Sequence, residues 1–235
     1  MPKQRAQDAC YMCDKPGLTR EHSPPYSFFP DDKRVNLITV PSCPTHNNRV
    51  SKDVEYVRNL VCSDFHANDV GQAVFQKAMR SFERSPKLLR QTYSRFREVI
   101  INGERTAVYK INMTRFNRVI RGIAYALYFH DFQKRFPFGW LVYNATMLSE
   151  DEGFRGLPDE VNRRMRLGSR QVPTADRDTN QPDVFCYGIQ RGDEEFKVFY
   201  RLVFYGGVDI YVFGTKPIEG VEHTPGSPRI YQVTT

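Results

Sequence analysis

Two pairs of metal-binding residues with the same internal spacing place the strongest constraint on the N-terminal part of this chain. Cys10-Tyr-Met-Cys13 is a CxxC pair, and Cys43-Pro-Thr-His46 is a CxxH pair. Two intervening residues allow a tight turn to bring both side chains of a pair to one ion. Three thiolates and one imidazole suit a tetrahedral structural zinc site. We therefore predict that Cys10, Cys13, Cys43 and His46 bind a structural Zn²⁺, which would also support a module with a small core.

The compartment in which the chain works bears on the alternatives for these cysteines. The segment Met1-Pro-Lys-Gln-Arg-Ala-Gln-Asp lacks the apolar run of a signal peptide, and no stretch is apolar enough to span a membrane. We expect a cytoplasmic protein, in which disulfides are rare. A redox-active CxxC or two buried thiols are the alternatives to zinc at the first pair. Cys62 and Cys186 have no partner at ligand spacing and are predicted to be core residues.

The charge of the chain is concentrated in its middle. The chain carries a net charge of +7, and residues 63–170 alone hold nineteen Lys/Arg and eleven Asp/Glu, a net of +8. A basic surface attracts polyanions such as nucleic acid. A series of basic residues recurs through the predicted helices, and it either neutralises phosphates or forms a solvated helix face. Its members are Lys77, Arg80, Arg84, Lys87, Arg90, Arg95 and Arg97.

The residues between and after the two ligand pairs predict a small α+β module. Short strands are expected at residues 18–22 and 36–40. A helix is expected from Pro44 onward, because proline fits a first helical turn and Val50, Val54, Val57 and Val61 follow at helical spacing. A zinc knuckle, a hairpin and a helix joined by one ion form the treble-clef arrangement.

The rest of the chain predicts a second α+β domain. Residues 66–99 show helical spacing that Pro86 interrupts, and Asn102-Gly103 is a turn signal between strands at 97–101 and 105–111. A helix at about 114–132 has an apolar stripe, with Arg115, Arg118 and Arg121 expected to face solvent. Aromatic and β-branched runs predict antiparallel strands within about 139–214, after a long loop at 149–182 that contains a short helix near 159–167.

The predicted organisation is therefore a zinc-stabilised treble-clef module at residues 1–62 and an α+β domain at 63–235. The helices of the second domain, at about 66–132, are expected to pack on its antiparallel sheet. DNA binding, dimerisation and regulation are the roles left open for this domain.

The order of motifs in residues 10–62 resembles the HNH nucleases, which implies a zinc-supported ββα-metal core in this module. It runs from the CxxC pair through Glu21-His22 and Asn36-Leu37 to Cys43-Pro-Thr-His46-Asn47-Asn48. The resemblance covers roughly a quarter of the chain. It implies His22 as the general base, Glu21 as a ligand of a catalytic metal, and Asn36 as the residue that orients His22 through hydrogen bonds.

The resemblance also implies where the helix contributes ligands to the catalytic ion, which would be Mg²⁺ or Mn²⁺. These positions are Asn47 and Ser51, one helical turn apart. The chain departs from the family pattern at Ser51, where histidine or asparagine is common, and at His46, where cysteine is commoner. Asp53 and Asn48 are nearby alternatives to Ser51.

The residue types suit phosphodiester hydrolysis, which needs an activated water and a cation that stabilises the leaving oxygen. The function expected is that of a metal-dependent HNH endonuclease acting on DNA, with RNA and a homodimer left open. Two alternatives remain: a zinc-containing module that binds nucleic acid without cutting it, and an interaction protein in which zinc only stabilises the fold.

Overall fold

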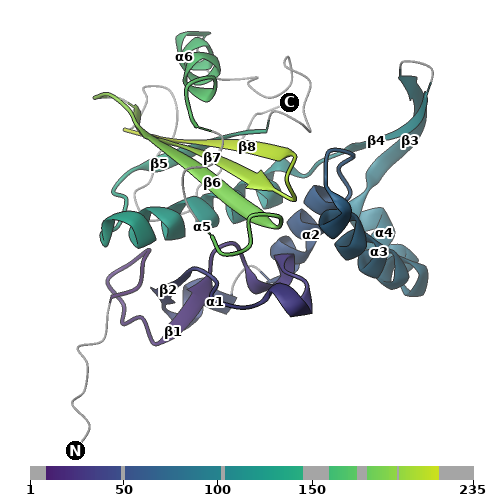
Figure 1. Ribbon diagram of the computed structural model, residues 1–235, viewed down its shortest axis with the longest axis horizontal. Coiled ribbons are helices and arrows are strands. Elements are labelled where there is room, and N and C mark those ends of the chain that lie inside the picture. Colours follow the sequence, from purple (N-terminus) through teal and green to yellow (C-terminus); the bar gives the residue numbers. More distant parts are fainter. Residues whose placement is uncertain are drawn as a thin grey trace, which may run out of the picture.

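The computed structural model describes residues 9–48, 51–101, 104–144, 159–173, 179–194 and 196–216. Over these ranges the chain is a mixed α+β protein with antiparallel sheets, which confirms the predicted fold class at that level. Its longest helix, α5 (Met113–Phe132), lies between a four-stranded sheet and the N-terminal segment (Figure 1). This helix therefore links the segment that contains the Cys/His pairs to the rest of the molecule.

The N-terminal segment is built on a short hairpin. Strand β1 (Thr19–His22) pairs antiparallel with β2 (Thr39–Ser42), and the connection contains the 3₁₀ turns η1 (Tyr26–Phe28) and η2 (Asp31–Lys33). The predicted strand at 36–40 was placed three residues too early. Asn36 adopts a left-handed φ of 53°, which is incompatible with an extended strand, so pairing begins only at Thr39.

The predicted helix after the second ligand pair is described in two parts. These are α1 (Pro44–Asn48) and α2 (Ser51–Cys62), and residues 49–50 between them, including Val50 of the predicted stripe, lie outside the described residues. Val57 and Val61 are fully buried, as helical spacing predicts. The apolar face of α2 therefore contributes to the core.

Helices α3 (Asp69–Arg84) and α4 (Pro86–Thr92) are separated at Ser85, as Pro86 predicted. The Ser85 hydroxyl accepts a hydrogen bond from the Leu88 amide and so caps α4. The hairpin of β3 (Ser94–Ile101) and β4 (Glu104–Lys110) follows and projects from these helices (Figure 1). The helical reading of residues 94–99 was wrong, because their alternating β-formers extend a strand that reaches back to Ser94.

The C-terminal sheet contains β5 (Gly139–Asn144), β6 (Phe185–Arg191), β7 (Phe196–Phe204) and β8 (Val208–Thr215). The strand order is β5-β8-β7-β6, and all pairs are antiparallel. Helix α5 packs against β5 and β8, whereas α3 and α4 pack against α2. The prediction that the helices pack on the sheet therefore holds for α5. On the opposite face of the sheet, α6 (Asp159–Ser169) contacts β7 (Figure 1).

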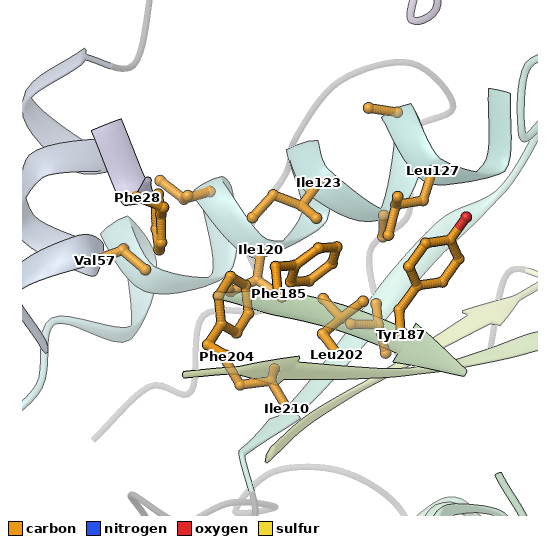
Figure 2. Packing of buried hydrophobic residues seen from close by; sticks show 14 of the residues in the cluster. Phe28, Val57, Ile120, Ile123, Leu127, Phe185, Tyr187, Leu202, Phe204 and Ile210 are labelled. Carbon is orange, nitrogen blue, oxygen red and sulfur yellow. The ribbon is translucent and has the colours of Figure 1, made fainter. Parts of the chain in front are cut away.

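One hydrophobic core includes both the N-terminal segment and the sheet. Figure 2 shows Ile120 and Leu127 projecting from α5 among the side chains of the strands, with Phe28 and Val57 at one end of the same cluster. The Tyr205 hydroxyl also donates a hydrogen bond to the carbonyl oxygen of Phe28 at 2.8 Å. The division into domains at residue 62 stays a prediction. None of the described helices is long and apolar enough to cross a membrane.

The polar side of α5 differs from its prediction. Arg115 and Arg118 both form ion pairs with Asp53 of α2, at 2.7 and 2.5 Å, and Arg121 is only 3% exposed. The expectation that these three arginines form a solvated face was therefore wrong. The reason is that α5 is covered on more than one side, so its polar face meets α2 instead of bulk water.

Candidate metal centre and active site

The two predicted ligand pairs converge in the folded chain. Cys10, Cys13, Cys43 and His46 place one ligand atom each within 4.8 Å of one another, and could hold a metal ion such as zinc. His46 Nδ1 lies 3.3 Å from Cys10 Sγ, 3.6 Å from Cys13 Sγ and 3.4 Å from Cys43 Sγ. The sulfurs of Cys13 and Cys43 are 3.9 Å apart. The pairs meet although they are about thirty residues apart in sequence.

These separations fit a tetrahedral zinc ion. Zn–S bonds of about 2.3 Å and a Zn–N bond of about 2.0 Å imply S···S separations of about 3.8 Å and S···N separations of about 3.5 Å at tetrahedral angles. The observed values lie within a few tenths of an ångström of both. The donor set therefore fits zinc in atom type and in spacing, with His46 binding through Nδ1.

The backbone around the ligands supports this arrangement. The Cys10 amide donates to the carbonyl oxygen of Lys15, which closes the knuckle that carries Cys10 and Cys13. Burial raises the pKa of the Cys43 thiol, but hydrogen bonds from the backbone amides of His46 and Thr45 and from the neighbouring thiols more than offset this, so the pKa of Cys43 is lowered. A lowered pKa favours the thiolate at Cys43, the form of cysteine that binds zinc, whereas burial and the neighbouring thiols raise the pKa of Cys13.

Glu21, the penultimate residue of β1, lies next to this centre. The Ser42 hydroxyl donates a hydrogen bond to Glu21 Oε2 at 3.2 Å, and the Tyr11 hydroxyl donates to the same carboxylate. Burial raises the pKa of Glu21, and the two hydrogen bonds act in the opposite direction. Glu21 is thus a half-buried carboxylate that the Cys10–Cys13 knuckle positions through Tyr11.

Asn47, the residue after the last zinc ligand, is tied to the same face of the hairpin. Its Nδ2 donates to Thr19 Oγ1 at 3.0 Å, and Thr19 Oγ1 donates to the carbonyl oxygen of Ser42 at 2.8 Å. Thr19 and Glu21 are two residues apart on β1, so their side chains leave the strand on one face. The structure therefore brings Glu21 and Asn47 to the same side of the hairpin.

His22 is the last residue of β1 and is paired with Thr39 of β2. Its ring lies beside Tyr26, with a centroid separation of 5.3 Å. Burial and the positive charge of Arg20 lower the pKa of His22, which favours the neutral imidazole near pH 7. A neutral imidazole can accept a proton, as a general base must.

The structure does not bring Asn36 into a hydrogen bond with His22. Asn36 is an exposed loop residue, and its carbonyl oxygen accepts a hydrogen bond from Asn180 Nδ2 at 3.1 Å. The backbone beside His22 is instead held by the Ser23 amide, which donates to the Ile38 carbonyl oxygen at 3.0 Å. A backbone hydrogen bond just beyond the β1–β2 ladder therefore lies where an orienting bond from Asn36 was predicted.

The second helical ligand position is less well placed. Ser51 is the first residue of α2 and is exposed, while the side chain of Asn48 lies outside the described residues. Asp53, the other alternative, has both carboxylate oxygens engaged by Arg115 and Arg118. The ion pairs of Asp53 thus hold α2 against α5.

A cavity of about 50 Å³ separates Glu21 and His22 from α5. Tyr11 and His46 also line it on the hairpin side, and Gly122 lines it on the helix side. A Cβ atom added at Gly122 would meet nothing within 4 Å, so the helix leaves space there. A cavity of this size has room for an ion or a few waters. A second, open hollow of about 1410 Å³ borders β2 near Arg20 and Lys134.

Sequence reasoning missed three contributors to this site. Tyr11 and Ser42 of β2 each donate a hydrogen bond to Glu21. Gly122 of α5 lines the opposite side of the cavity that Glu21 borders. Tyr11 stands between the first two zinc ligands, and a glycine within the apolar stripe of a long helix is a signal of close or open packing. Ser42 has no comparable signal in the sequence.

No protein-family model, no curated protein and no solved structure matches this chain.

Proposed function

We propose that this chain is a metal-dependent endonuclease of the HNH type, with a zinc-supported treble-clef module at residues 10–62. The observation that carries the proposal is that Glu21 and Asn47 lie on one side of the hairpin beside the Cys/His centre, while His22 directly follows Glu21 and lines the same cavity. Glu21 and His22 end β1, and Asn47 follows the last zinc ligand and is fixed to β1 through Thr19. The zinc centre thereby determines the distance between the strand and the helix that supply these groups.

The chemistry assigned to the chain follows from these groups. His22, held neutral by burial and by Arg20, accepts a proton from the attacking water. Glu21 and Asn47 supply a carboxylate and an amide oxygen, the ligand types that Mg²⁺ and Mn²⁺ take, and the adjoining cavity of about 50 Å³ leaves space for an ion. When bound, such an ion stabilises negative charge on the leaving oxygen.

DNA is the proposed substrate, because the net charge of +7 favours a polyanion and the family resemblance favours a phosphodiester. The test is cleavage of supercoiled plasmid by purified, zinc-containing protein with added Mg²⁺ or Mn²⁺. Nicked or linear product that requires the added ion supports the proposal. The control without ion is best prepared by dialysis, since a strong chelator would also remove structural zinc.

A second candidate is a zinc-containing module that binds nucleic acid without cutting it. Three observations favour it. The carboxylate of Glu21 already accepts two hydrogen bonds, α5 lies over the cavity that Glu21 faces, and Ser51 is exposed at the start of α2. This candidate predicts salt-dependent binding of DNA, no product with either ion, and full zinc content.

A further inference from the structure

The outer side of α3 and α4 carries a cluster of cations, here called the α3–α4 basic face and consisting of Lys77, Arg80, Arg84, Lys87 and Arg90. All five are exposed. The two helices contain only two acidic residues, Asp69 and Glu83. Both helices stand out from the body of the molecule, next to the projecting β3–β4 hairpin (Figure 1). The cluster is therefore open to a large partner.

The spacing of the α3 cations aligns them along one side of the helix. Lys77, Arg80 and Arg84 follow at i, i+3 and i+7, on the side of the helix opposite the buried residue Phe82. They span roughly 10 Å along the helix axis, given a rise of 1.5 Å per residue. Three cations over that length match the dense phosphate charge of a DNA backbone.

Four of the five cations are not neutralised by the described part of the protein. Lys77 forms an ion pair with Asp31 at 3.7 Å. Arg80, Arg84, Lys87 and Arg90 form no ion pair with any carboxylate of the described residues. Ordinary solvated helix faces mix charges of both signs. The excess of unpaired positive charge on this face therefore favours an external anion.

A series of contacts joins this face to His22. The His22 ring lies beside Tyr26, and the Arg34 guanidinium lies over the Tyr26 ring at 4.2 Å. Arg34 then pairs with Asp31, which also pairs with Lys77 of α3. Tyr26 is 46% exposed, so this path follows the surface of the molecule. A backbone bound on α3 can thus continue toward the candidate general base.

The chemistry of the face indicates which form of nucleic acid it binds. Surfaces that bind single strands present aromatic rings on which bases stack. Among the described side chains of α3 and α4, none of the exposed ones is aromatic, since Phe82 is buried and Phe75 is partly buried. A convex row of cations contacts phosphates without reading bases. These features favour the outside of a duplex.

We infer that the α3–α4 basic face binds the phosphate backbone of duplex DNA without regard to sequence, and positions the duplex so that it extends past Arg34 and Tyr26 to His22. The inference rests on the proposed function for the identity of the polyanion and for the role of His22. The inference assigns most of the free energy of DNA binding to residues outside 10–62.

The experiment measures binding separately from cleavage. The His22→Ala chain is titrated into a fluorescein-labelled duplex of random sequence without added divalent ion, and anisotropy is read over a series of salt concentrations. The test variant adds Arg80→Glu and Arg84→Glu. A second test variant instead adds Lys87→Glu and Arg90→Glu, both on α4, to the His22→Ala chain. The matched control adds Arg163→Glu and Arg170→Glu, which make the same charge change at α6, on the opposite face of the sheet from α5.

The inference predicts that the α3 variant binds at least about tenfold more weakly at low salt, and that its log–log salt slope falls by about two, one for each lost phosphate contact. The α4 variant weakens binding in the same direction. Arg80→Lys with Arg84→Lys retains binding within about threefold, because charge is kept. Circular dichroism and zinc content check that each variant is folded.

The opposite pattern overturns the inference. If the α3 variant binds as tightly as its parent, or if the α6 control loses as much affinity as the α3 variant, the face is not the binding surface. That conclusion holds whether or not the unmodified chain cleaves DNA. Conversely, loss of binding in the α3 variant supports the inference even if no cleavage is ever observed, and only the proposed nuclease function then fails.

Discussion

Asn47 donates its side-chain amide to the hydroxyl of Thr19 at 3.0 Å, and so joins the helix that begins at the metal centre to the strand that ends at His22. Thr19 is in turn joined to β2, because its own hydroxyl donates to the carbonyl oxygen of Ser42. The link connects the two elements that supply the proposed catalytic groups.

Asn47→Ala tests the two roles of this residue. Loss of the hydrogen bond to Thr19 should lower the free energy of unfolding by about 1 kcal/mol. Cleavage should fall by a far larger factor than this change explains, since a ligand of the proposed catalytic ion is also lost. Urea unfolding and plasmid cleavage measure the two effects. Thr19→Val is the control, because it removes the acceptor but leaves the amide, and should lose stability while keeping most activity.

Removal of zinc should unfold the N-terminal segment. The Cys/His centre joins the knuckle to the start of α1, whereas the backbone hydrogen bonds of the knuckle run from Cys10 to Lys15 and from Tyr11 to Pro41 of β2. Zinc binding of this kind is part of the folding free energy. Cys13→Ala should therefore contain less than one zinc per chain and melt at a markedly lower temperature. Cys186→Ala, at a cysteine outside the cluster, should retain one zinc, as elemental analysis can show.

Asp53→Asn should destabilise the chain without abolishing cleavage. The Asp53 side chain is 13% exposed and pairs with both Arg115 and Arg118, so its loss leaves two cations of α5 without their partner. A loss of about 1 to 3 kcal/mol in the free energy of unfolding is expected for such a charged hydrogen-bonded pair. Retained cleavage would exclude Asp53 as the second helical metal ligand. Absent cleavage in a folded, zinc-containing Asp53→Asn chain would instead assign it that role.

Cys62 should make stability fall at alkaline pH. Burial raises the pKa of its thiol to about 12, and its Sγ donates to the Asn59 carbonyl oxygen. A group with a raised folded-state pKa stabilises the fold fully below its unfolded pKa of about 8.5, and this contribution is lost as pH rises toward 12. The free energy of unfolding should therefore drop faster between pH 9 and pH 11 in the parent chain than in Cys62→Ala. Parallel curves would contradict this account.

The sequence predicted the elements better than their contacts. Local patterns placed α5, α6 and the four strands of the C-terminal sheet close to their observed positions, because apolar periodicity and turn residues act locally. The convergence of the Cys/His cluster was predicted for a similar reason, since each pair occupies a single tight turn. By contrast, the burial of Arg121 and the pairing of Asp53 depend on how α5 packs against α2, which no local pattern records.

The candidate site shows the same division. Glu21 and His22 were predicted from motif order, and the structure places both at the end of β1. The missed residues belong to other elements: Gly122 reaches the site only because α5 crosses the hairpin. The orienting role of Asn36 was implied by the resemblance to HNH nucleases. Its left-handed backbone keeps it in the loop instead.

The most direct test of the central proposal is cleavage of supercoiled plasmid by the parent chain, His22→Ala and His66→Ala, all with one zinc per chain and added Mg²⁺ or Mn²⁺. His66 is a matched control, because it is a partly exposed histidine whose partner is Asp64. We predict cleavage by the parent and by His66→Ala, and a loss of at least about a hundredfold in His22→Ala, as for removal of a general base. Equal cleavage by His22→Ala and the parent would contradict the account.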